Sequence, residues 1–478
     1  MSILFWLSVI FILYSYALYP WLVALLARLK PGPAPYPPYA PTVTLLIAAY
    51  NEKAVIAEKL ENSLSLDYPR EKLQILVAAD GSDDGTDALV AGFSDRGVEL
   101  SFRPERGGKM AAIDHALQKA RGEILLMSDA NNLYSPNTLR ALVAPFQDAS
   151  VGATGGAKHV IEGDGALGDS EGAYWKYESW LKKQETRLGC ATGAAGEANA
   201  MRRRLYVAPP RDTINDDYFL MTQVFRQGYR MVYVPQAQSF ERVSVSARDE
   251  SERRARIVAG RYQAMARSAK MLPFKHPLWL WQLISHKYTR PLVPFFMILA
   301  LVSALMAVIW PSAASPAWLW LSAPWNGLAL GAQVIFYLAA LLGNFIGERG
   351  KVGKLFYLTS FLVNSNLSAL RGFWRFATRG QNAQWKRAQR RAGRGARARL
   401  WAGGWTRRRR RRGRDRALAR RDHQLLAAPR SRCAPAQRRV ATARAARANQ
   451  RLWHPDGRAL DARRHQLARV RDHRELGR

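Results

Sequence analysis

The chain has 478 residues and a formal net charge of +35, with 72 lysines and arginines against 37 acidic residues. From Arg387 onward it holds about 30 arginines, no lysine and about 6 acidic residues, so the rest carries about +11. That remainder is ordinary for a membrane protein with basic loops. The only cysteines, Cys190 and Cys433, exclude a disulfide-rich secreted domain and indicate a reducing compartment.

An uncharged apolar segment lies near the start of the sequence, at residues 3–27, and is long enough to span a bilayer. A cleavable signal peptide is less favoured, because basic residues follow the apolar run and no small-residue cleavage site stands out. Arg28 and Lys30 place the following residues in the cytoplasm by the positive-inside tendency. We predict a transmembrane helix over 1–29 and a stiff proline-rich linker over 30–41.

Residues 42–268 alternate strand-like and helix-like stretches. Apolar, β-rich runs occur at 42–50, 73–80, 98–104 and 123–129, with helical patterns between them. Buried strands separated by helices predict a parallel α/β sheet, in which ligands bind beyond the carboxyl ends of the strands. Asn51, Asp80 and Asp129 lie at three such ends, so we expect them to line one site.

Membrane character returns in the second half of the chain. Residues 291–310 and 326–347 are convincing spans, whereas 355–370 is short, carries two asparagines and either spans or lies in the interface. Tryptophans mixed with lysine and histidine predict a surface helix over 269–290. We therefore assign a transmembrane region of two or three spans to 291–386.

Two glycine-containing motifs could bind a nucleotide. Asp80 ends a strand at the start of the turn-rich stretch ADGSDDGT, where its carboxylate could accept hydrogen bonds from a base or ribose. An Asp-Gly turn before a helix explains the same residues. Two glycines precede Lys109 at a predicted helix start, which suits a phosphate, although a solvated lysine after a capped loop fits as well.

Paired carboxylates and clustered arginines follow further along. Asp216 and Asp217 precede an amphipathic helix, where helix capping is the plain explanation and a general base is the functional one. A neighbouring carboxylate and desolvation would raise the pKa of such a base, whereas the helix dipole and a metal would lower it. The arginines of 253–263 form either a basic membrane flank or a guanidinium that reaches a leaving diphosphate.

Five motifs occur in a specific order: AAYNE (48–52), ADGSDDGT (79–86), GGK (107–109), SDANN (128–132) and NDD (215–217). In this order they resemble the motifs of family 2 inverting glycosyltransferases with the GT-A fold. The resemblance covers about residues 42–268. With the flanking membrane segments it extends to the membrane-embedded cellulose, hyaluronan and poly-N-acetylglucosamine synthases. It implies an α/β catalytic domain with a Rossmann-like mixed sheet, flanked by transmembrane helices.

The resemblance also implies a role for each matching residue. Binding of the nucleotide sugar would fall to Tyr50, Asn51, Asp80, Lys109 and Asp129. Catalysis would fall to Asp217 as the base, Asp216 beside it and Arg256 at the diphosphate. The cation, Mg²⁺ or Mn²⁺, would be held by Asp129 and Asn131. The acceptor side would be formed by Gly193, Gly196 and Glu197.

Two positions depart from the family pattern. Asn131 replaces the last carboxylate of the Asp-x-Asp motif, so we expect a working but weakened cation site that depends on the donor's diphosphate. The Gln-x-x-Arg-Trp motif is reduced to Arg256 followed by Ile257. The missing tryptophan is associated with the acceptor terminus in processive synthases, so its absence weakens the case for a long polymer.

The leading hypothesis is a membrane-bound glycosyltransferase that moves a sugar from a UDP-sugar to a glycan acceptor in exopolysaccharide or cell-surface polysaccharide synthesis. We expect it in a bacterial inner membrane with its catalytic domain in the cytoplasm, in contact with membrane lipid and not with nucleic acid. One alternative is a single transfer to a lipid carrier or short glycan. Another is a non-catalytic nucleotide-sugar-binding membrane protein, which the retained Asp80, Asp129 and Asp217 disfavour.

The arginine-rich segment 387–478 has little apolar periodicity and cannot bury enough surface to fold alone, so we predict disorder. An electrostatic anchor for anionic lipid or nucleic acid is one interpretation. The abrupt loss of lysine favours another, in which a GC-rich gene is read out of frame after about residue 387. We assign this segment no function.

Overall fold

In the computed structural model, the described residues are 1–32, 35–160, 166–193, 198–241, 247–311, 318–346 and 350–381. The predictions for Gly196, Glu197 and the segment 387–478 fall outside these described residues.

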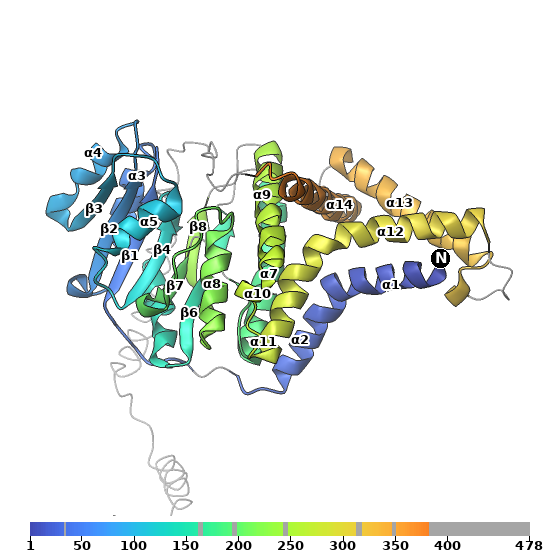
Figure 1. Ribbon diagram of the computed structural model, residues 1–478, viewed down its shortest axis with the longest axis horizontal. Coiled ribbons are helices and arrows are strands. Elements are labelled where there is room, and N and C mark those ends of the chain that lie inside the picture. Colours follow the sequence, from blue (N-terminus) through green and yellow to red (C-terminus); the bar gives the residue numbers. More distant parts are fainter. Residues whose placement is uncertain are drawn as a thin grey trace, which may run out of the picture. The chain divides into compact units, whose positions relative to one another are not determined.

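The first half of the α/β region forms a parallel sheet, as the sequence predicted (Figure 1). Its strands are β1 (Val43–Ala49), β2 (Leu73–Asp80), β3 (Val98–Arg103) and β4 (Ile124–Asp129). The connecting helices are α3 (Ile56–Leu64), α4 (Thr86–Ala91) and α5 (Lys109–Leu117). Alternate residues of β1 pack on opposite faces: Leu45 lies in a cluster with Ile56, and Leu46 lies in a cluster with Ile113. Burial on both faces explains why this strand is an unbroken apolar run.

The second half turns the sheet into a mixed one. It adds β5 (Leu133–Tyr134), β6 (Val151–Val160), β7 (Asn199–Arg202) and β8 (Arg230–Glu241). The spatial order is β3-β2-β1-β4-β7-β6-β8-β5, and β7 runs antiparallel to both β4 and β6. The helices of this half are α6 (Thr138–Val143), α7 (Ala166–Leu188), α8 (Asp216–Arg226), α9 (Ala247–Ala266) and α10 (Ser268–Met271). Short 3₁₀ turns occur at Arg70–Lys72, Ser94–Arg96, Ala144–Gln147, Arg203–Leu205 and Trp318–Trp320.

Three helical segments are long and apolar enough to cross a membrane: Ser2–Arg28, Pro277–Ile309 and Trp325–Ile346. The first joins α1 (Ser2–Leu13) to α2 (Tyr19–Arg28) through a π turn at Tyr14–Leu18. The second joins α11 (Pro277–Leu283) to α12 (Thr289–Ile309) through a π turn at Ile284–Tyr288. The segment for which the sequence predicted a separate surface helix therefore continues directly into the second candidate span. The third is α13 (Trp325–Ile346).

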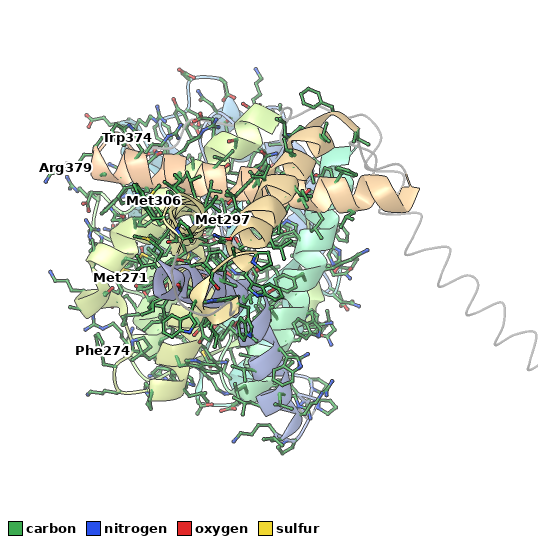
Figure 2. The ribbon with its side chains drawn as sticks, turned by 90° about the vertical axis from the view of Figure 1, so that its right-hand side faces the viewer. Met271, Phe274, Met297, Met306, Trp374 and Arg379 are labelled. Carbon is green, nitrogen blue, oxygen red and sulfur yellow. The ribbon has the colours of Figure 1, made fainter. Side chains whose placement is uncertain are left out.

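The last helix, α14 (Gly350–Ala377), contains the segment whose membrane placement the sequence left open. It packs against α9 and α13, and Arg254 of α9 donates a hydrogen bond to Ser365 of α14 at 2.9 Å. Figure 2 views these helices from the side away from the sheet, with Met297 and Met306 on α12 and Trp374 on α14. Through α9, this helix is joined to the part of the sheet that carries the candidate site.

Candidate active site

The loops after β1 and β2 are joined at the carboxyl edge of the sheet. Asn51 adopts a left-handed backbone conformation (φ 52°), and its backbone N–H donates to Ser82 Oγ at 3.1 Å. Its side-chain amide donates to Asp83 Oδ1 at 2.7 Å and accepts from the Asp83 N–H at 3.0 Å. The Arg106 guanidinium lies 4.1 Å from the centre of the Tyr50 ring. Tyr50 and Asn51 therefore border the same turn that follows Asp80.

Asp80 fixes the Gly-Gly-Lys segment. Its Oδ1 accepts from the Gly107 N–H at 2.8 Å, and its Oδ2 accepts from the Gly108 N–H at 2.7 Å. Gly108 has φ 92°, a conformation that side-chain-bearing residues rarely adopt, and it immediately precedes α5. The carboxylate thus fixes the turn that precedes Lys109, and the Arg103 guanidinium lies 3.8 Å from its Oδ1.

Lys109 joins residues that are far apart in the sequence. Its Nζ lies 2.8 Å from Asp129 Oδ1 at the end of β4 and 3.6 Å from Asp216 Oδ2 at the start of α8. Burial opposes its charge, but Asp129 and Asp216 outweigh burial and raise the pKa of Lys109. A permanent cation therefore lies between two carboxylates at the edge of the sheet.

The two adjacent carboxylates of α8 have opposite electrostatic environments. Burial and the neighbouring Asp216 raise the pKa of Asp217. Burial acts the same way on Asp216, but Lys109 and Arg256 outweigh it and lower the pKa of Asp216. Paired groups whose pKa values are driven apart are typical of acid–base sites. Asp217 is the one of the two that is suited to accept a proton.

Helix α9 is hydrogen-bonded to the residues just before α8. Arg256 Nη1 donates to the carbonyl of Ile214 at 3.3 Å, and Asn215 Nδ2 donates to the carbonyl of Ile257 at 2.8 Å. At Gly260 a Cβ atom would lie 2.4 Å from Asn215 Cγ, so only glycine permits this approach. The sequence singled out Arg256, and the structure brings it to Asp216.

The residues around Asp129 can be tested for their fit to a divalent cation. Asn131 Oδ1 is buried and lacks a hydrogen-bond partner among the described residues, and Asp129 remains partly exposed. A carboxylate and an amide oxygen are ligands that Mg²⁺ or Mn²⁺ accepts when substrate phosphates supply the others. In the described part of the chain, no three His, Cys, Asp or Glu residues are grouped to hold a metal without such help. The residues therefore fit a cation that binds together with the donor.

Sequence reasoning missed Lys59, whose buried side chain contacts the loop that follows β4. Its Nζ donates to the carbonyl of Asn132 at 2.8 Å and to Asn132 Oδ1 at 3.1 Å, and lies 3.9 Å from the centre of the Tyr134 ring. The side chain is fully buried, and burial lowers the pKa of Lys59 to about 7. The only signal in the sequence is its position three residues after Ile56, on the apolar face of α3.

On the acceptor side, the described structure reaches only Gly193. A Cβ atom at Gly193 would lie 3.4 Å from Lys287 Cε and 3.8 Å from its Nζ. Lys287 belongs to the π turn before α12 and was not singled out by the sequence. It lies beside the segment that the resemblance assigns to the acceptor.

A mixed α/β sheet with a carboxylate–lysine site at its carboxyl edge, attached to candidate membrane helices, defines a GT-A-like domain. Residues 40–269 match the protein family described as "Glycosyltransferase like family 2". This match covers just under half of the chain and includes all five motifs, so it confirms the resemblance seen in them.

Two curated relatives are distant. The chain is 28% identical over 169 residues to the beta-monoglucosyldiacylglycerol synthase of Trichormus variabilis, which is 34% of this chain and 36% of the relative. It is 24% identical over 249 residues to the poly-beta-1,6-N-acetyl-D-glucosamine synthase of Staphylococcus aureus, which is 50% of this chain and 59% of the relative. The chain thus spans less than two thirds of the length of either relative.

A solved structure shares the fold. The mannosyltransferase PcManGT from Pyrobaculum calidifontis, determined with GDP-Man and Mn²⁺, superposes with a TM-score of 0.57 at 24% identity. The match covers 77% of this chain and 99% of that one. It confirms the predicted fold class.

Proposed function

We propose that this chain is an inverting, membrane-bound glycosyltransferase that moves a sugar from a UDP-sugar to an acceptor hydroxyl. One observation carries the proposal. Lys109, Asp129 and Asp216 meet from three distant segments, directly beside Asp217, whose pKa is raised. A cation, a ligand for a metal–diphosphate and a base are the groups that such a transfer requires.

In the proposed reaction, Asp217 accepts the proton of the acceptor hydroxyl while that oxygen bonds to the anomeric carbon of the sugar. The bond from this carbon to the diphosphate oxygen breaks in the same step, and UDP leaves with the electron pair. A single in-line displacement inverts the configuration at this carbon.

Negative charge develops on the diphosphate as it leaves. Lys109 and Arg256 would neutralise part of this charge, and both already interact with Asp216 at the start of α8. Asp129 and Asn131 would hold Mg²⁺ or Mn²⁺, which when bound supplies further stabilisation of the leaving group. Asp80 would order the Gly-Gly-Lys turn and, with Tyr50 and Asn51, border the nucleoside.

The relatives suggest the setting of the reaction. One is a synthase of poly-beta-1,6-N-acetyl-D-glucosamine and the other of a glucosyl-diacylglycerol, so polysaccharide and glycolipid products are both compatible. The three candidate spans support a site at the cytoplasmic face of a bacterial inner membrane, where nucleotide sugars are present.

UDP release by purified membranes tests the proposal. A panel of UDP-sugars is offered with and without Mg²⁺ or Mn²⁺, and at least one sugar should yield cation-dependent UDP release. Membranes that contain the Asp217→Asn protein serve as the control, because that variant should bind UDP without transfer. If no UDP-sugar gives release above this control, the proposal is wrong.

A further inference from the structure

A guanidinium with one unsatisfied donor lies next to the proposed base. Arg261 of α9 stacks on Tyr218, with Cζ 4.0 Å from the ring centre, and its Nη1 is buried without a hydrogen-bond partner among the described residues. Its charge acts on Asp217 and lowers the pKa of that group, against the larger effects of burial and Asp216. A buried guanidinium donor is costly to leave unsatisfied, so its position indicates an anionic ligand.

A second cation approaches from the candidate span. Lys287 lies beside Gly193, and it is close enough to Arg261 for their charges to repel each other. The two elements are fixed together, because Tyr288 donates to the carbonyl of Ala264 at 3.2 Å and Tyr262 donates to that of Pro291 at 2.6 Å. Arg261 and Lys287 therefore belong to one wall that runs from Asp217 to Gly193.

The carboxylates nearest to this wall already have other partners. Glu178 accepts from Arg290, contacts His286 Nε2 at 3.2 Å and lies 3.9 Å from Lys287 Nζ. Glu185 accepts from Tyr19 at 2.6 Å and contacts His286 Nδ1 at 2.7 Å. Neither pairs with Arg261 among the described residues, and Glu178 is shared by Arg290 and Lys287.

The charges divide the site into two sides. Both carboxylates interact with Lys109, which we assign to the donor's diphosphate, but Arg256 acts on Asp216 and Arg261 acts on Asp217. Arg261 is thus placed on the side from which an acceptor hydroxyl would reach the base. An acceptor made only of neutral sugar would bring no anion to Arg261 Nη1, the donor that lacks a partner among the described residues.

We propose that Arg261 and Lys287 bind the phosphate of a phosphorylated lipid that carries the acceptor sugar, while a hydroxyl of that sugar faces Asp217. The inference rests on the proposed function. Lys287 lies in the candidate span Pro277–Ile309, shortly before its uncharged run at 291–309, so a phosphate bound there would be at the depth of lipid headgroups. Guanidinium and ammonium groups are the usual protein ligands of phosphate.

The test uses the full chain in phosphatidylcholine nanodiscs with a UDP-sugar that supports release. Three acceptors carry the same sugar: a prenyl diphosphate-linked sugar, an uncharged alkyl glycoside and a water-soluble sugar phosphate. UDP release above the acceptor-free rate gives the KM for each. We expect the KM of the diphosphate lipid to be at least about tenfold below those of the other two.

Variants then assign the preference to residues. Arg261→Gln and Lys287→Gln should each raise the KM of the diphosphate lipid about tenfold, with the KM of the alkyl glycoside and the Kd of UDP changed less than about twofold. Arg267→Gln is the matched control, because Arg267 comes directly after α9, within two turns of Arg261, but is ion-paired with the exposed Asp212. It should behave as the wild type.

Other outcomes would overturn the inference. Equal KM values for the diphosphate lipid and the alkyl glycoside in the wild type would show that the protein does not recognise the phosphate, whatever the variants do. A soluble sugar phosphate with a KM as low as that of the diphosphate lipid would show that the protein does not recognise the lipid part of the acceptor. A large loss of UDP affinity in Arg261→Gln places Arg261 on the donor's diphosphate instead. If the wild type releases no UDP in any arm, the proposed function fails and takes this inference with it.

Discussion

At the residue scale, two adjacent carboxylates with opposite environments are the central feature. Asp217 needs to lose its proton to act as a base, and its raised pKa means that this happens at a higher pH than for an ordinary aspartate. We predict that Asp217→Asn lowers transfer by roughly 100- to 10,000-fold while the Kd of UDP stays the same. Transfer at the normal rate in this variant would assign the base elsewhere.

The same carboxylate predicts a pH profile. The deprotonated form is active, so the transfer rate of the wild type should fall as pH drops through the raised pKa of Asp217 and reach a plateau above it. Asp216, whose pKa is lowered, stays ionised over this range and should not add a second step. A rate that is independent of pH on the acid side would contradict the assignment. The measurement is UDP release at saturating donor and acceptor from mildly acidic to neutral pH.

Asn131 gives a second prediction at this scale. Its buried amide oxygen lacks a partner among the described residues, and a carboxylate there would add a negative charge next to Asp129. We expect Asn131→Asp to lower the Mg²⁺ or Mn²⁺ concentration for half-maximal UDP release by about tenfold, since ligand charge tunes cation affinity. Asn131→Ala should raise that concentration. An unchanged cation requirement in both variants would show that this side chain does not face the ion.

At the element scale, α14 packs against α9, which in turn supports the start of α8 and the proposed base Asp217. A Cβ atom at Gly372 would lie 2.7 Å from the carbonyl oxygen of Ala255 and 2.8 Å from Val258 Cβ. Both of these residues lie within one helical turn of Arg256. Arg375 of α14 also pairs with Glu252 of α9 at 2.5 Å. The order of support therefore runs from α14 through α9 to the Asn-Asp-Asp segment at the start of α8.

We predict that Gly372→Val pushes α14 away from α9 and lowers both the melting temperature and the transfer rate. Overpacking of this kind costs about 1–3 kcal/mol. Gly327→Val on α13 is the matched control, because no atom lies within 4 Å of its added Cβ. Thermal unfolding and UDP release in nanodiscs are measured for both variants. Equal effects of the two substitutions would argue against a bracing role for α14.

The buried Lys59 makes the loop after β4 sensitive to pH. Burial lowers the pKa of Lys59 to about 7, so between about 7 and the ordinary lysine value the unfolded chain binds a proton that the folded chain does not. Folding stability should therefore rise with pH in this window, by at most about 1.4 kcal/mol per pH unit. Lys59→Met should flatten the rise in melting temperature, and the exposed Lys119→Met should keep it. A rise that survives in Lys59→Met would contradict this origin.

The first half of the sheet, with its strand ends at one edge, could be predicted from the sequence. The reason is that a buried parallel strand is a local apolar run with a polar residue at its carboxyl end. Asn51, Asp80 and Asp129 could be placed together on that basis. Lys59 and Arg261 could not, since their roles depend on which long-range neighbours bury them. The four-residue β7, which makes the sheet mixed, has too short a pattern to stand out, and its pairing with β4 spans more than 70 residues.

At the scale of the whole molecule, the candidate spans and α14 bring both ends of the described chain together. Tyr14 in the first candidate span contacts Ser285 in the second at 2.6 Å, and Tyr16 accepts from Asn366 of α14 at 3.1 Å. The side chains that we propose for catalysis come from β4, α5, α8 and α9, so we expect the candidate spans and the sheet to fold together. The minimal active unit should therefore extend through α14.

We predict that deletion of residues 391–478 leaves UDP release unchanged, because every contact described for the site comes from residues before this segment. A longer deletion, of 350–478, removes α14 as well and should abolish release, since α9 then loses its packing partner. Both proteins are compared in membranes at equal amounts, with UDP binding as a check that the sheet is folded. Loss of release in the shorter deletion would give the arginine-rich segment a role in the reaction. Retention of activity in the longer one would show that α9 holds the Asn-Asp-Asp segment without α14.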